Sequence, residues 1–205
     1  MTRMVAVDAE APAAAALREA AAVLASGGLL AFPTESFYGL GADAFDPRAL
    51  ARIFEVKGRP ESKPLLVLVD GLAMAESLVR AFPAPARELA TRHWPGPLTL
   101  VLPAAAHLSE RLTAGTGTIG IRMPGHAVAL ELVRTARRPV TAPSANVSGA
   151  PPPTTARGVC DYFGDALDLI LDAGPTAGGA GSTIADCTVW PPRVLRQGAI
   201  EVGAS

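Results

Sequence analysis

Short apolar segments that end at proline or glycine are the feature of this sequence that most constrains its fold. The run LLVLV at 65–69 lies between Pro64 and Asp70, and similar runs recur along the chain. Each has the length of a strand, and continuous apolar character is typical of strands that are covered on both faces. The 19 prolines and 20 glycines fall mostly at the ends of these predicted strands.

The apolar runs predict strands at 29–32, 65–69, 97–103, 118–124, 139–145, 167–174, 182–189 and 193–198. The intervening segments predict helices at 11–26, 47–57, 72–80, 84–93, 127–137 and 154–163. The segment 33–45 is rich in turn formers, so we expect a loop there. This alternation indicates an α/β (α+β-like) fold with a twisted mixed sheet, and 205 residues suit a single domain over 1–205.

The helix at 47–57 carries the clearest local signals. Asp46 is a typical N-cap residue, and Pro47 suits the first helical position. Leu50, Ile53 and Phe54 repeat at helical spacing, so one face of this helix should be buried. Gly58 is expected to end the helix, because glycine tolerates the left-handed cap.

Composition narrows the class of protein. The net charge is -1, from 18 basic and 19 acidic residues, which argues against a bulk nucleic-acid binder but not against a local basic cleft. Cys160 and Cys187 lie far apart without a CxxC pair, so we expect no disulfide framework and a reducing compartment. The N-terminus has no apolar signal core, and Arg18 and Glu19 interrupt the alanine-rich run. We therefore expect a soluble cytoplasmic protein without a membrane segment.

Three cations lie within seven residues in KGRPESKPLLVLVD, which runs from Lys57 to Asp70. Lys57, Arg59 and Lys63 are expected on a loop just before a buried strand. They form either a solvated turn or a cluster that faces an anion.

Polar side chains also gather where predicted strands end. Ser36 lies in PTES after 29–32, Arg122 ends TIGIR, Ser144 follows PVTA, and Arg196 ends RVLR. TIGIR alternates, so Arg122 should point away from the core if Ile119 and Ile121 point into it. Ligands of α/β proteins bind where strands end, so this distribution predicts one cleft with an anionic occupant. Taken singly, each of these sites is equally compatible with an ordinary turn.

Other chemistries find little support. The glycine-rich stretch from Gly174 to Ile184 is not a P-loop, because no lysine precedes Ser182 and a strand follows. The three histidines show no HExxH spacing, and no G-x-S-x-G elbow is present. Lone aspartates at turns and caps are usually structural, so we predict no protein-held metal.

Seven motifs occur in a fixed order, and together they resemble the YrdC family of threonylcarbamoyl-AMP synthases. They are PTESFYGLG, KGRPESKPL, WPGPLTLVL, GIRMPGH, APSANVSG, GSTI and LRQG. The resemblance covers about 27–198. It implies a twisted mixed sheet flanked by helices around a large open cleft, in the short, single-domain form of the family.

The resemblance also implies an activity. Members combine L-threonine, bicarbonate and ATP, which carries Mg²⁺, to form threonylcarbamoyl-AMP and pyrophosphate. They are nucleotidyltransferases, and tRNA-modification transfer proteins then move the threonylcarbamoyl group to tRNA.

Site residues follow from the motif positions. The cations Lys57, Arg59 and Lys63 form the expected catalytic set. Positions expected to contact L-threonine are Ser36, Leu68, Arg122, Ala142 and Ser182. Positions expected to contact ATP are Arg59, Lys63, Thr118, Ser144, Pro152 and Arg196. Ser36 stands where the family has threonine, and Phe37 where valine is common.

Two alternatives remain open. An RNA-binding module of the same pathway would use the arginines at 134, 137 and 138, with weak RNA contact. A related carbamoyl-adenylating enzyme of hydrogenase maturation would act on carbamoyl phosphate, but there the YrdC-like unit lies in a much longer chain with zinc fingers.

Overall fold

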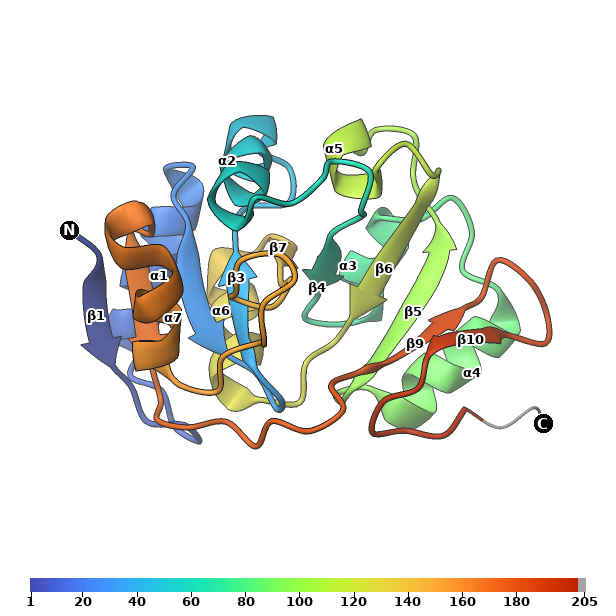
Figure 1. Ribbon diagram of the computed structural model, residues 1–205. Coiled ribbons are helices and arrows are strands. Elements are labelled where there is room, and N and C mark those ends of the chain that lie inside the picture. Colours follow the sequence, from blue (N-terminus) through green and yellow to red (C-terminus); the bar gives the residue numbers. More distant parts are fainter. Residues whose placement is uncertain (203–205) are drawn as a thin grey trace.

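The computed structural model describes residues 1–202, which form two mixed sheets side by side (Figure 1). The last three residues of the predicted domain, 203–205, lie outside the described residues. The first sheet has the order β1 (Arg3–Ala6), β8 (Leu169–Asp172), β2 (Leu30–Pro33) and β3 (Tyr38–Gly41). The second has the order β10 (Arg193–Arg196), β9 (Thr183–Asp186), β5 (Leu98–Pro103), β6 (Thr118–Arg122), β4 (Leu66–Leu68) and β7 (Val140–Thr141).

Backbone pairing continues from one sheet to the other. The amide of Leu40 in β3 donates to the carbonyl of Pro143 at 2.8 Å, and the amide of Ala145 donates to the carbonyl of Tyr38 at 2.8 Å. Parallel pairs such as β1–β8 and β5–β9 mix with antiparallel pairs such as β2–β3 and β5–β6. The prediction of a mixed sheet is confirmed.

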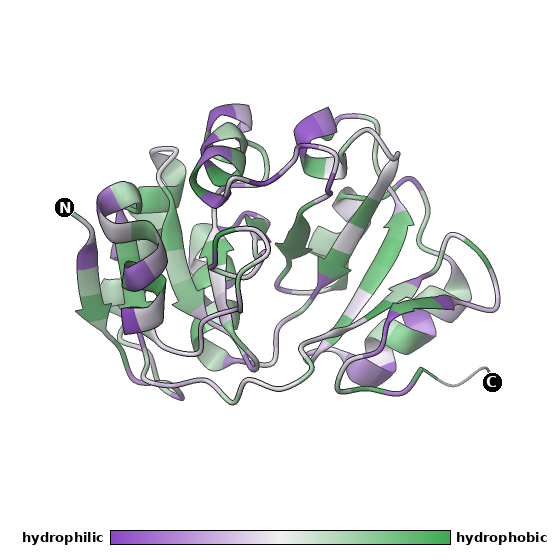
Figure 2. Ribbon diagram, in the orientation of Figure 1, coloured by the Kyte–Doolittle hydropathy of each residue, from purple (hydrophilic) through white to green (hydrophobic). Residues whose placement is uncertain are grey.

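Helices cover both faces of the first sheet. One core cluster joins α1 (Ala14–Ala25) and α6 (Ala127–Ala136) to β2 and β8. Another joins α2 (Pro47–Lys57) and α7 (Ala156–Phe163, followed by the 3-10 turn Gly164–Ala166) to the opposite face. Figure 2 shows hydrophobic colour concentrated on the strands and hydrophilic colour on the outer sides of the helices. None of the helices in residues 1–202 combines the length and the hydropathy that crossing a membrane requires.

Local signals fix α2 as predicted. The Asp46 side chain accepts hydrogen bonds from the amides of Arg48 at 2.8 Å and Ala49 at 3.4 Å. Gly58 ends the helix in the left-handed region at φ 54°. Side-chain capping satisfies amides that have no partner inside a helix, so these bonds stabilise the start of α2 locally.

Several elements differ from the sequence prediction. The helix expected at 72–80 stops as α3 (Leu72–Ser77), because Val79 and Arg80 pair with the end of β5. Strand β1 pairs in parallel with β8, and a short helix α5 (Glu110–Thr113) precedes β6; neither was predicted.

The segment expected as a loop contains β3, which pairs antiparallel with β2. Its glycines made the strand hard to recognise in the sequence, yet packing requires one of them, Gly41. A Cβ atom at Gly41 would lie 2.9 Å from the Phe32 ring, which is closer than a Cβ atom can approach another carbon atom.

Strand alternation leaves one side of the second sheet open. Leu98, Leu100 and Leu102 of β5 pack on α4 (Ala84–His93), so Thr99 and Val101 face the opposite side. In β6, Ile119 and Ile121 join the core as the alternation predicted. The uncovered side is where the cleft lies.

Candidate functional site

A cleft of about 420 Å³ lies between the β2–β3 hairpin and the uncovered side of the second sheet. The hairpin contributes Thr34 and residues 36–39, and the loop after β7 contributes Ala142, Pro143 and Ser144. The opposite wall comes from β5, β6, β9 and β10, which are distant in sequence but adjacent in the sheet (Figure 1).

Most of the residues predicted for the site line this cleft. They are Ser36, Arg59, Thr118, Arg122, Ala142, Ser144, Pro152, Ser182 and Arg196. The structure therefore brings the predicted threonine and ATP positions into one cavity. Lys57, Lys63 and Leu68 do not line it.

The expectation that Lys57 shares a loop with Arg59 and Lys63 is wrong, whereas the predicted helix at 47–57, which includes Lys57, is confirmed. Lys57 is the last residue of α2 and only 2% exposed. Its Nζ donates to the carbonyls of Ser144 at 2.5 Å and Asn146 at 2.6 Å. Burial lowers the pKa of Lys57 to about 8, and the charge of Arg59 acts in the same direction. Because its donors hold the backbone of the loop at 144–146, Lys57 acts on the cleft through that loop.

Lys63 and Leu68 also lie away from the cleft, so their side chains do not line it. Lys63 is exposed on the loop between α2 and β4. The Leu68 side chain is fully buried in the core, while its backbone pairs with Arg122 in β6. Leu68 therefore supports the strand that carries Arg122.

Arg59 is the cation of that loop that faces the cleft. Its Nη2 donates to the carbonyl of Pro64 at 2.9 Å and its Nε to that of Lys63 at 3.4 Å. These bonds fold the loop around the guanidinium and direct it to the cavity. Partial burial lowers the pKa of Arg59.

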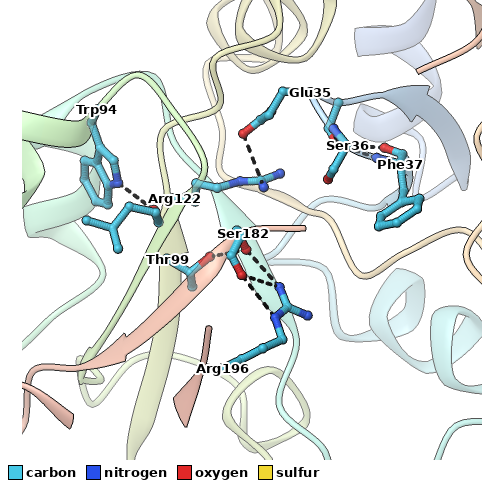
Figure 3. Close-up of polar contacts among 10 residues, drawn as sticks. Glu35, Ser36, Phe37, Trp94, Thr99, Arg122, Ser182 and Arg196 are labelled. Atoms are coloured by element: carbon cyan, nitrogen blue, oxygen red, sulfur yellow. Dashed lines mark hydrogen bonds and ion pairs between the residues drawn. The ribbon is translucent and has the colours of Figure 1, made fainter. Parts of the chain in front are cut away.

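Arg122 ends β6 and is 3% exposed. Its Nη1 lies 3.4 Å from Oε1 of Glu35, and Figure 3 shows the guanidinium extending below Glu35 towards Ser36. Burial lowers the pKa of Arg122, Glu35 raises it, and Arg196 lowers it. Within the described residues, Nε of Arg122 has no hydrogen-bond partner. A buried guanidinium with an unpaired donor suits an anionic ligand.

Two hydroxyls and a guanidinium are hydrogen-bonded to one another along one wall of the cleft. Oγ of Ser182 lies 3.0 Å from Oγ1 of Thr99, and Nη2 of Arg196 donates to the same Oγ at 3.0 Å (Figure 3). Arg196 also donates to the carbonyl of Ser182 through Nε and Nη2. Hydrogen bonds thus connect Thr99, on a buried strand, through Ser182 to Arg196 at the exposed rim of the cleft.

The hairpin tip is held by backbone contacts. The carbonyl of Ser36 accepts from Oγ1 of Thr176 and from the amide of Gly178, both at 2.7 Å. The glycine-rich segment after β8 therefore positions Ser36, and the Phe37 side chain lines the cleft beside it. The sequence singled out this segment without finding its role.

Sequence reasoning missed two side chains of this site, Glu35 and Thr99. Glu35 lies inside the PTES motif, next to a residue that was predicted, so the motif itself carried the signal. Thr99 was hidden in an apolar strand, and only the alternation in PLTLVLP indicates its direction.

The donors of the site suit anions. Cations and hydroxyls line the cleft, and in residues 1–202 no three His, Cys, Asp or Glu side chains lie where they could hold a metal ion. Fixed cations and hydroxyls stabilise phosphates and carboxylates.

Comparison with known proteins gives consistent matches. Residues 22–198 match the Sua5/YciO/YrdC family, whose description reads "Telomere recombination". The chain is 46% identical to the threonylcarbamoyl-AMP synthase of Pyrococcus abyssi, over 90% of this chain and 54% of that protein. It is 44% identical to the threonylcarbamoyl-AMP synthase of Bacillus subtilis, over 90% of this chain and 54% of that protein.

A solved structure matches the fold closely. The crystal structure of P. abyssi Sua5 complexed with L-threonine has a TM-score of 0.93 at 45% identity. The match covers 96% of this chain and 58% of the other. The chain therefore spans a little over half the length of these relatives.

Proposed function

The chain belongs to the Sua5/YciO/YrdC family, and from this premise we propose that it is a threonylcarbamoyl-AMP synthase. The reaction is a nucleotidyl transfer. L-threonine and bicarbonate give a carbamate with loss of water, and a carbamate oxygen attacks the α-phosphorus of ATP. The new O–P bond replaces the bond to pyrophosphate, which leaves.

The observation that carries this proposal is the buried Arg122, which lines the cleft and whose Nε has no hydrogen-bond partner among the described residues. A planar guanidinium can grip both oxygens of an α-carboxylate. Ser36 and Ser182 offer hydroxyls to the rest of an amino acid. The relative that was crystallised with L-threonine shares this fold at 45% identity, which supports the same ligand here.

ATP fits the other end of the cleft. Arg59 and Arg196 supply cations, and Thr118 and Ser144 supply hydroxyls. Attack of a carbamate on a triphosphate brings two anions together, so charge neutralisation and positioning are the main contributions of the protein. Lys63, on the same loop as Arg59, would add charge once phosphates occupy the cleft.

We expect Mg²⁺ to enter with ATP. The polar side chains that line the cleft are cations and hydroxyls, a donor set that suits phosphates better than a metal ion. Bound to ATP, the ion would reduce the charge of the phosphates, while Arg59 and Arg196 would hold the nucleotide in the cleft.

The product needs partners, because threonylcarbamoyl-AMP is a mixed anhydride that must be passed on. We propose separate transfer proteins that act on tRNA. The arginines considered for direct RNA contact are partly engaged: Arg134 pairs with Glu131 at 2.6 Å and Arg138 with Asp43 at 2.8 Å. We therefore do not assign RNA binding to them.

Pyrophosphate release tests the proposal. The reaction should require ATP, Mg²⁺, L-threonine and bicarbonate together, and omission of any one should abolish release. Release that ignores threonine and bicarbonate would make the protein a nucleotide hydrolase. Release that needs carbamoyl phosphate instead would favour the carbamoyl-adenylating alternative.

A further inference from the structure

The side chain of Glu35 ends in a buried carboxylate whose oxygens have no hydrogen-bond donor among the described residues. Within the part of the chain that the structure describes, neither of its oxygens accepts a hydrogen bond, although both are inaccessible to solvent. Among the described residues its ion-pair contact is the 3.4 Å approach of Oε1 to Nη1 of Arg122. A buried charge without hydrogen bonds is costly, so its presence needs an explanation beyond stability.

Glu35 changes what Arg122 can bind. Alone, Arg122 would attract any small anion, including bicarbonate, pyrophosphate and the phosphates of ATP. The adjacent carboxylate offsets the positive charge of Arg122, on which Arg196 also acts, and it repels a second anion. An occupant that brings its own positive charge next to its carboxylate escapes this repulsion. The zwitterion of an α-amino acid has that arrangement.

We propose that Glu35 is a specificity-determining residue that restricts the Arg122 end of the cleft to zwitterionic α-amino acids by accepting their ammonium group. The inference rests on the proposed function and extends it. Arg122 takes the α-carboxylate, and Glu35 takes the α-ammonium. The same repulsion directs the triphosphate to the opposite end, where Arg59 lines the cleft without a carboxylate partner among the described contacts.

The position of Glu35 suits this role. It lies between Thr34 and Ser36, both of which line the cleft at the hairpin tip. Its side chain is 20% exposed although its oxygens are covered, so its aliphatic part reaches the surface. Figure 3 shows the carboxylate of Glu35 above the guanidinium and Ser36 beside it. Rotation of the terminal carboxylate, which is broadly permitted, would turn an oxygen towards an occupant.

Competition between two ligands tests the proposal. The probes are L-threonine and 3-hydroxybutyrate, which is threonine without its ammonium group. Their affinities are measured by calorimetry or by competition for the wild-type chain and for Glu35→Gln, which keeps the side-chain size and removes the charge. We expect wild type to prefer threonine strongly. In Glu35→Gln this preference should fall by about tenfold or more, because one charge-assisted contact is lost.

Controls separate this role from a structural one. Glu88→Gln, on the exposed side of α4, should leave the preference unchanged, and ATP affinity should report whether Glu35→Gln is folded. If Glu35→Gln loses affinity for threonine and 3-hydroxybutyrate equally, Glu35 only positions Arg122. If the ratio of the two affinities is unchanged, Glu35 has no part in selecting the ligand. Either result overturns the inference while the proposed function stands. A wild-type chain that binds no threonine would overturn both.

Discussion

The two ends of the cleft hold their cations in different ways. Arg122 ends a central strand, is 3% exposed and has Leu68 beside it in the next strand. Arg59 lies on the loop between α2 and β4, half-buried, and its guanidinium is held by carbonyls of the same loop. A strand between two neighbours fixes the direction of a side chain, whereas a loop holds it through a few local bonds. We infer that substrate selection belongs to the strand end and charge neutralisation to the loop end.

The largest effect is expected from Arg122→Lys, which tests the strand end. Lysine keeps the charge but loses the planar pair of donors. The KM for threonine should rise by about 100-fold, with a much smaller change in the KM for ATP. Steady-state titration of each substrate measures this. Arg157→Lys, on the exposed side of α7, is the matched control. Equal weakening for both substrates would make Arg122 a general support of the cleft.

Substitutions in the loop between α2 and β4 should affect ATP more than threonine. Arg59→Ala should lower turnover by about 10- to 100-fold and raise the KM for ATP more than that for threonine. Lys63→Ala should do the same to a smaller extent, since Lys63 does not line the cleft. Arg48→Ala, on the exposed side of α2, should be neutral. If both loop variants keep wild-type turnover, the loop is only a solvated turn.

Lys57 belongs to neither end, and Lys57→Met tests that distinction. Methionine keeps the unbranched apolar stem but leaves the carbonyls of Ser144 and Asn146 without their donor. The free energy of unfolding should fall by about 1–3 kcal/mol, measured by urea denaturation.

The exposed Lys63 supplies the matched comparison, because Lys63→Met should change the free energy of unfolding by less than about 0.5 kcal/mol. Lost turnover with unchanged stability in Lys57→Met would restore Lys57 as a catalytic cation.

The smallest effect is expected from Ser182→Ala, where the two ends meet. The change removes the hydroxyl shared by Thr99 and Arg196, but Arg196 keeps its bonds to the carbonyl of Ser182. The KM values for threonine and ATP should therefore rise together by about tenfold or less. If the KM for only one substrate rises, Ser182 belongs to the end of the cleft that binds that substrate, and the two ends are more clearly separated.

Much of this cleft could be predicted from the sequence because its signals are local. Motif residues at strand ends of the two sheets converge on the cleft between them, as Ser36, Arg122, Ser144 and Arg196 do. The alternation in TIGIR placed Ile119 and Ile121 in the core and Arg122 on the other side. Residues whose role depends on a distant partner were misjudged or missed, as Lys57 and Glu35 demonstrate.

The sequence by itself determined the elements whose energetics are local. Asp46 and Gly58 bound α2 through hydrogen bonds and backbone geometry within a few residues, and the apolar run at 65–69 required a strand covered on both faces. Only the tertiary structure decided that β3 forms, because its Gly41 is needed where the Phe32 ring approaches. It also decided that Lys57 is buried and that Glu35 meets Arg122. The physical reason is that burial and charge pairing depend on contacts between residues far apart in the chain, and a local pattern carries no information about them.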